Sequence, residues 1–232
     1  MSMPKELIAN NVILVSHPIS LGMRLMDDPM EKIAVAELLF KAGQQTALSL
    51  SFSTAAAFLH LAIELLDRRH RRDDYQLRLM LYNFAAELEY HLGNLQRFDN
   101  LVSAVLVLAR CFDDTLVAHF TRIYSLRSRG SMQEGLEESL DVLNSLGETL
   151  PRRPSKFHVL VGLVRCKQVL HGKTDESILR LAHMNDKRKH AAMRLMIYAM
   201  LFAFYSSAKH VPLIAFRLTE NTLRYGMSEM GK

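Results

Sequence analysis

The sequence is poor in the residues that build turns, and it contains no tryptophan. Of 232 residues only 10 are glycine and 6 are proline, whereas leucine and alanine occur 38 and 21 times. Strong helix formers therefore greatly outnumber turn formers. This composition predicts an all-α fold and argues against a β-sandwich, a β-barrel or an α/β nucleotide-binding fold with glycine-rich loops.

Cysteines and long apolar runs are also scarce. The two cysteines, Cys111 and Cys166, are too few for a secreted disulfide scaffold. The first ten residues, MSMPKELIAN, lack the charged start and apolar centre of a signal peptide, so we expect a cytoplasmic protein. The most membrane-like run, Leu195–Tyr205, is eleven residues long. A membrane span needs about 20 residues, so this run predicts a buried core helix and no membrane contact.

Charge is distributed unevenly along the chain. Residues 1–150 carry 14 basic and 19 acidic side chains, whereas residues 151–232 carry 15 basic and 5 acidic ones. The overall formal charge of +5 hides this difference. Such a division is typical of a chain that meets an acidic partner, a nucleic acid or a neighbouring part of the same assembly.

The apolar pattern predicts about ten helices with short connections. Residues 1–30 are irregular, residues 31–150 contain a regular series of helices, and residues 151–232 continue it as a basic region after the linker PRRPSK. The first expected helix begins at Glu31. Further helices are expected at residues 53–66, 75–92, 94–110, 115–129, 131–146, 155–170, 175–182 and 186–208, and the last one ends near Gly226.

Local signals mark the ends of these helices. Glycine is favoured just after a helix because it adopts positive φ freely, and we expect Gly93, Gly130, Gly147 and Gly172 to end helices. Ser131 with Glu134 matches a capping box. Asp113 or Asp114, and Thr174, are further candidate N-caps.

The helices repeat in pairs. The stops Gly93, Gly130 and Gly172 are 37 and 42 residues apart, and the small or apolar first-helix positions Gly43, Ala86 and Ile123 are 43 and 37 apart. The second helices begin equivalently at Ala55, Phe98 and Gly135. A repeated helix–turn–helix unit of this size predicts an α-solenoid, in which each unit buries its apolar face on its neighbours. An irregular helical bundle is the alternative.

The residues also carry a resemblance. In the segment from Ala36 to Leu66, the positions of Leu39, Gly43, Ala55, Leu59 and Ala62 resemble a tetratricopeptide-repeat (TPR) unit. The second unit keeps Tyr82, Ala86 and Gly93, and the third has His119 and Gly135, so the repeat is degenerate.

Longer phrases are similar to the helical-repeat region of large signalling ATPases of the AAA or STAND type, which are linked to kinase, histidine-kinase or cyclase modules. These phrases are AELLFKAGQQTA, FLHLAIELLDRRHRRDDYQLRLMLYNFAAELEY, EGLEESLDVLNSLGETLP, LAHMNDKRKHAAMRLM and LRYG. The resemblance covers roughly residues 30–226 and implies that the chain is a regulatory segment of a larger protein. Neither the ATPase part nor the kinase part of such a protein is visible in this sequence.

Patterns for catalysis or metal binding are weak. Gly172-Lys173-Thr174 imitates the end of a phosphate-binding P-loop, but Lys167 stands where the first glycine belongs. None of the ten histidines pairs with another histidine or a suitable carboxylate at the spacing of a zinc-binding helix, and the adjacent carboxylates fit helix faces and caps. We therefore expect a protein that is not an enzyme and has no catalytic residues, cofactor or metal.

Basic residues form the remaining candidate sites. Arg68, Arg69, Arg71 and Arg72 are the densest cluster, and Arg152, Arg153, Lys187, Arg188 and Lys189 could extend it to a phosphate-binding surface. Aromatic residues, which favour binding of single-stranded nucleic acid, are not interleaved with them. A solvated loop or a contact with a partner domain is the simpler interpretation.

The expected function is a non-catalytic scaffold that binds a protein partner or adjacent domains of a larger chain. The first helix of each pair would line a concave surface, with Asn83, Glu87, Tyr90, Arg122 and Tyr124 as candidate contacts, together with Arg68, Arg69, Arg71 and Arg72. One alternative is a segment of a signalling ATPase or kinase without a separate function. The other is a basic helical-repeat protein that binds RNA or DNA.

Overall fold

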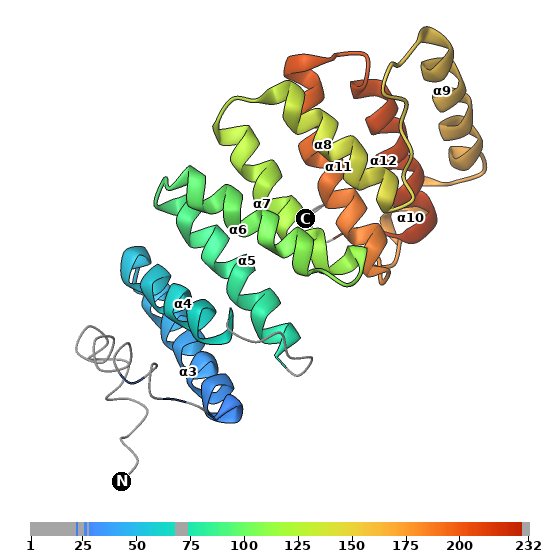
Figure 1. The fold of residues 1–232 in the computed structure, drawn as a ribbon. Helices are drawn as coiled ribbons and strands as arrows, with labels where there is room; N and C mark the ends of the chain where they lie inside the picture. The colour runs from blue at the N-terminus through green and yellow to red at the C-terminus, as the bar shows by residue number, and fades with distance from the viewer. Residues whose placement is uncertain (1–21, 23–25, 27, 68–73, 229–232) are drawn as a thin grey trace. The chain divides into compact units, whose positions relative to one another are not determined.

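The computed structural model of the protein describes residues 22, 26, 28–67 and 74–228. Within these residues the elements are all α-helical, and the bridge between His183 and Met227 is isolated. The described residues contain the ten helices α3 (Pro29–Leu48), α4 (Phe52–Asp67), α5 (Tyr75–His91), α6 (Leu95–Leu108), α7 (Phe112–Ser128), α8 (Met132–Ser145), α9 (Lys156–Leu170), α10 (Asp175–Leu179), α11 (Lys187–Ser206) and α12 (Val211–Tyr225) (Figure 1). The all-α prediction is confirmed.

The chain forms two compact units, and the division falls within α7. Unit 1 is Met1–Arg122 and unit 2 is Ile123–Lys232. The PRRPSK linker lies inside unit 2, where Pro151 and the residues beside it pack, as described below. The expected regions 31–150 and 151–232 stay a prediction.

In unit 1 the helices from α3 to α6 pack in the order of the chain. α3 packs on α4, α4 on α5, and α5 on α6. At Gly43 a β-carbon would lie 3.0 Å from Leu59 Cδ2, so the absent side chain lets α3 and α4 approach closely. Leucine, alanine and phenylalanine side chains fill the core of these hairpins, among them Leu39, Leu59, Leu81 and Phe98.

In unit 2 the packing follows another order. α8 packs on α11, α11 on α12, and α12 on α9. A β-carbon at Gly135 of α8 would lie 2.4 Å from Cε1 of Phe202, which is fully buried, so the glycine makes room for α11. A sequential solenoid would stack each pair on its neighbour in the chain, whereas here α11 packs on α8 from beyond α9 and α10. The solenoid arrangement therefore stays a prediction.

The helix ends agree with most of the local signals. Positive φ, between 74° and 84°, is found at Gly93, Gly130, Gly147 and Gly172, and each of them is the second residue after the end of a helix. Thr174 caps α10 as predicted, because its hydroxyl accepts from the backbone N–H of Ser177.

Two cap predictions are wrong. Ser131 precedes α8 but makes no side-chain cap hydrogen bond, whereas Ser155 and His158 form a capping box at α9 that we did not predict. α7 begins at Phe112, before the aspartates. The Asp114 Oδ2 atom reaches back to the backbone N–H of Cys111 at 3.2 Å and accepts a hydrogen bond from the Tyr75 hydroxyl at 2.5 Å.

The apolar run in α11 is a core helix along most of its surface. Leu195, Met196, Ala199, Phe202 and Ala203 are buried. The predicted burial does not extend to the end of the run, since Phe204 and Tyr205 are 69% and 66% exposed. Over the described part of the chain, every helix is too short or too polar to cross a membrane.

Candidate functional site

The predicted concave-surface residues of α5 lie in different environments. Asn83 is partly buried and donates its side-chain N–H to the carbonyl of Leu79 at 2.9 Å. Tyr90 packs its ring on Phe98, with ring centroids 5.9 Å apart. Glu87 is exposed. Of these three residues, Glu87 is therefore the one fully presented to a partner.

The two predicted residues of α7 fall on either side of the division between units. Arg122 is the last residue of unit 1, whereas Tyr124 belongs to unit 2. The Tyr124 ring meets Tyr198 edge to face with centroids 5.3 Å apart, and the Arg127 guanidinium lies 5.5 Å from the Tyr124 ring. Burial, together with the hydrogen bond to Tyr124, raises the pKa of Tyr198. Tyr124 thus already has partners within the protein.

The arginine cluster lies outside the described residues. Arg68, Arg69, Arg71 and Arg72 follow α4 in a segment that the structure does not describe. Neither these arginines nor the concave surface as a whole is tested by the structure, and both stay predictions.

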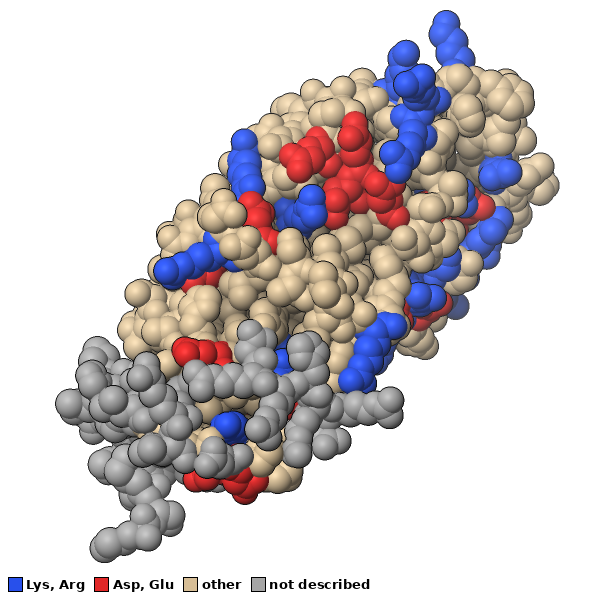
Figure 2. Space-filling model, viewed as in Figure 1, with Lys and Arg blue, Asp and Glu red and all other residues tan. Residues whose placement is uncertain are grey.

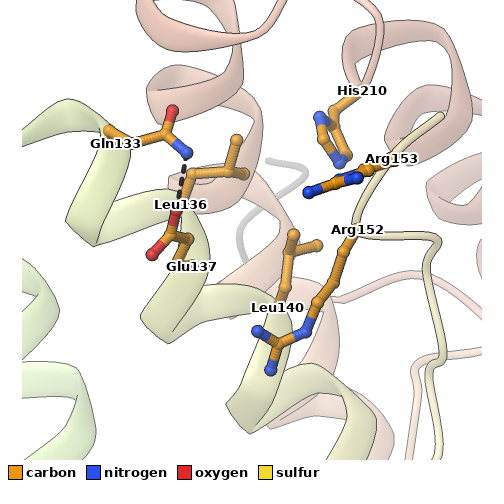
Figure 3. A pocket seen from close by; sticks show the side chains of 7 residues that line it. All are labelled: Gln133, Leu136, Glu137, Leu140, Arg152, Arg153 and His210. Atoms are coloured by element: carbon orange, nitrogen blue, oxygen red, sulfur yellow. Dashed lines mark hydrogen bonds between the residues drawn. The ribbon is translucent and has the colours of Figure 1, made fainter.

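Unit 2 contains a hollow that sequence reasoning did not predict. Its volume is about 400 Å³, within the range of ligand pockets. α8 contributes Gln133, Leu136, Glu137 and Leu140, whose spacing places them on one side of the helix. The other wall consists of Arg152 and Arg153 from the segment after α8, and of His210 at the start of α12 (Figure 3).

His210 fixes the upper wall of this hollow. The side chain is 3% exposed, with Nε2 3.0 Å from the carbonyl oxygen of Pro151 and Nδ1 2.9 Å from the Ser207 hydroxyl. A carbonyl oxygen only accepts hydrogen bonds, so Nε2 carries the proton and donates it. His210 therefore joins the linker, which carries Arg152 and Arg153, to the turn between α11 and α12.

The walls of the hollow differ in chemistry. Buried Leu136 and Leu140 form an apolar floor, and Figure 3 shows Gln133 and Glu137 on the α8 side, where the Gln133 amide donates to Glu137 at 2.7 Å. On the opposite side Arg152 pairs with Asp141, and the Arg153 side chain is exposed. The site can therefore hold an apolar group together with a carboxylate or phosphate near Arg153.

The charges around the hollow are mixed. On the face shown in Figure 2, acidic side chains gather over α8, with Lys and Arg side chains next to them. α8 carries four acidic residues in its 14, and the linker carries two arginines. The face thus favours a ligand that has charges of both signs over a polyanion.

A buried carboxylate holds the neighbouring segments together. Glu148 is 2% exposed, and its oxygens lie 2.6 Å from Lys189 Nζ, 2.9 Å from Asn221 Nδ2 and 3.6 Å from Arg217 Nε. These contacts join the segment after α8 to α11 and α12. Two cations of the expected phosphate-binding surface thus already have partners, Lys189 in Glu148 and Arg152 in Asp141.

Signals for this site in the sequence are slight. The i, i+3, i+4, i+7 pattern from Gln133 to Leu140 and the Arg152–Arg153 pair are visible, but Glu148 and His210 have no local signature. Among the described residues, no group of three or more His, Cys, Asp or Glu side chains could hold a metal ion.

Comparisons with protein-family models, with curated proteins and with solved structures found nothing that matches this chain.

Proposed function

We propose that the protein is a non-catalytic scaffold of TPR-like helix pairs that mediates contacts between proteins or between domains. The observation that supports this proposal is the stacking of α3/α4 on α5/α6. The positions equivalent in the repeat, Gly43, Ala86 and Ile123 in the first helices and Ala55, Phe98 and Gly135 in the second, are all buried. Buried equivalent positions are what stacked helix pairs require.

The hollow in unit 2 is the site at which we expect a partner segment to anchor. An apolar side chain of the partner would enter the hollow beside Leu136 and Leu140, while an acidic side chain or chain end would meet Arg153. Binding energy in protein interfaces concentrates in such small sites, with an apolar anchor and one well-placed charge. The partner is either another protein or an adjacent domain of a longer chain.

A peptide-display selection on the full chain tests the anchoring site. Wild-type protein should enrich peptides in which an acidic residue lies within a few positions of a large apolar residue. The Arg153→Glu variant should lose this enrichment, because it places a carboxylate where the peptide carboxylate would bind. Lys41→Glu, an exposed lysine of α3, is the matched control and should leave the enrichment unchanged.

Two results would contradict the proposal. One is an identical peptide profile for the wild type and the Arg153→Glu variant. The other is retention on RNA or DNA that falls steeply with salt concentration, which would support the nucleic-acid alternative instead.

The expected link to a signalling ATPase needs a separate test. An antibody against residues 75–150 should detect a band several times larger than the calculated 26.5 kDa in whole-cell extract if the chain is an excerpt of a larger protein. A single band near 26.5 kDa would contradict this link and would leave a separate adaptor protein.

A further inference from the structure

Helix α9 presents a stripe of large apolar side chains to solvent. Phe157, Leu160 and Val164 are 71%, 58% and 48% exposed, and their spacing of three and four residues aligns them along one side of the helix. Leu163 and Leu170 extend the stripe along one edge and are 37% and 38% exposed. Scattered exposed apolar residues are common, but five on one side of a 15-residue helix mark an interaction surface.

The opposite side of α9 is already covered. A β-carbon at Gly162 would lie 2.9 Å from the Phe216 ring and 3.5 Å from Leu213 Cδ2, so α9 packs closely on α12 there. Cys166, one turn later, is buried. The stripe therefore faces away from the helix that holds α9 in place.

The position of α9 in the packing order of unit 2 indicates what the stripe is suited to meet. α11 packs on both α8 and α12, and α12 packs on both α11 and α9, so α9 is the outer layer of this order. Outer layers of stacked-helix proteins usually carry a polar face towards water. An apolar outer face instead favours one further helix as the next layer, packed by its own side-chain ridges.

The charges of α9 indicate the chemistry of that helix. Lys156 and Lys167 lie on the same side as the stripe, separated by 11 residues, or about three turns and ~16 Å. Arg165 is the remaining charged residue of the helix, and α9 contains no acidic side chain. A partner with carboxylates beside its apolar face would complement both ends of the stripe.

We propose that the α9 stripe, Phe157, Leu160, Leu163, Val164 and Leu170 with Lys156 and Lys167, docks an acidic amphipathic helix of a partner protein. This surface uses none of the residues of the hollow, so it goes beyond the function proposed above and the two proposals can fail separately. An anionic membrane surface would also attract lysines beside apolar side chains. The outer position of α9 in a series of helix layers favours the helix.

Two synthetic peptides of identical leucine pattern test the proposal with the full chain. One carries glutamates beside its leucine face and the other carries lysines at the same positions, each with a fluorescent label for anisotropy. We expect the glutamate peptide to bind at least about tenfold more tightly than the lysine peptide. Leu160→Asp should weaken glutamate-peptide binding by about tenfold or more, because it places a charge at the centre of the stripe.

A charge exchange gives the sharpest readout. The double variant Lys156→Glu with Lys167→Glu should reverse the preference, binding the lysine peptide more tightly than the glutamate peptide. Val107→Asp, at an 88% exposed apolar position of α6, and Lys41→Glu are the matched controls and should leave both affinities unchanged. All substituted side chains are exposed, so circular dichroism and thermal unfolding should match the wild type.

Three outcomes would overturn the proposal. The first is equal or undetectable binding of the two peptides, and the second is unchanged binding by the Leu160→Asp variant. The third is binding to phosphatidylcholine–phosphatidylserine vesicles that requires Leu160, without affinity for either peptide. If the display selection shows no peptides that depend on Arg153, the proposal for the hollow fails. The anisotropy measurements on the α9 stripe would still stand.

Discussion

Single buried carboxylates join neighbouring helices in both units. In unit 1, Glu89 of α5 is 1% exposed and accepts hydrogen bonds from His60 of α4 and from Asn94, which precedes α6, both at 2.6 Å. Arg97 lies 3.8 Å away. Burial raises the pKa of Glu89, but the hydrogen bonds from His60 and Asn94 and the nearby positive charges outweigh burial, so the pKa lies below its ordinary value.

The lowered pKa of Glu89 predicts how the Glu89→Gln substitution changes the free energy of unfolding at different pH values. Because the folded-state pKa is depressed, the ionised carboxylate stabilises the fold fully above the unfolded-state pKa of about 4.3, and this contribution is lost as the pH falls through the folded-state value. We expect the variant to lose about 1–3 kcal/mol of unfolding free energy at pH 7. Urea unfolding between pH 7 and pH 3 should show the difference from wild type shrinking below pH 5. A difference that is the same at every pH would contradict the assignment.

At the scale of the helix, the sequence predicts where a helix ends better than it predicts which other helix packs against it. Gly93 and Gly130 end helices through a local property, the freedom to adopt positive φ, so their role is visible in the sequence. The apolar periodicity of α8 likewise predicts which side is buried. It cannot predict that α11 covers that side, because the contact of Gly135 with Phe202 joins residues 67 positions apart.

Gly135→Ala provides a test of this helix contact. In an ordinary helix interior the change would stabilise the protein by about 1 kcal/mol. Here the added methyl would overlap the buried Phe202 ring, so we expect a net loss of about 1–3 kcal/mol, measured by urea unfolding. Phe202→Leu in the same chain should recover part of the loss as a coupling energy.

Gly162→Ala is the matched control for this overlap. Its β-carbon would lie 2.9 Å from Phe216, which is only partly buried and can move, so the loss should be clearly smaller. A Gly135→Ala variant as stable as wild type would show that α8 and α11 do not pack closely at this position.

At the scale of the molecule, pairing modifies the charge predicted from the sequence. The C-terminal excess of basic residues suggested a polyanion partner, yet Lys189 and Arg217 bind Glu148, and Arg224 binds Glu220 at 2.9 Å. The hollow could not be predicted from the sequence, because its walls come from α8, the linker and His210, which only the tertiary fold brings together.

The packing order also predicts how each unit responds to truncation. In unit 1 each helix from α3 to α6 packs on its neighbour in the chain, so residues 1–128 contain every described helix that this core needs. In unit 2, α8 packs on α11 and α9 packs on α12, so residues 1–170 contain two helices without their partners. We expect fragment 1–128 to unfold in one cooperative transition, and fragment 1–170 to add no second transition.

Hydrogen exchange measured by mass spectrometry distinguishes these states. In fragment 1–170 the amides of α8 and α9 should exchange at least about tenfold faster than in the full chain, since unpacked helices of this length are marginal in water. The amides of α4 and α5 should stay protected in all three proteins, which provides the internal control. Protection of α8 in fragment 1–170 equal to that in the full chain would mean that α8 is stabilised by helices earlier in the sequence, as the sequential solenoid predicts, and that its packing on α11 contributes little.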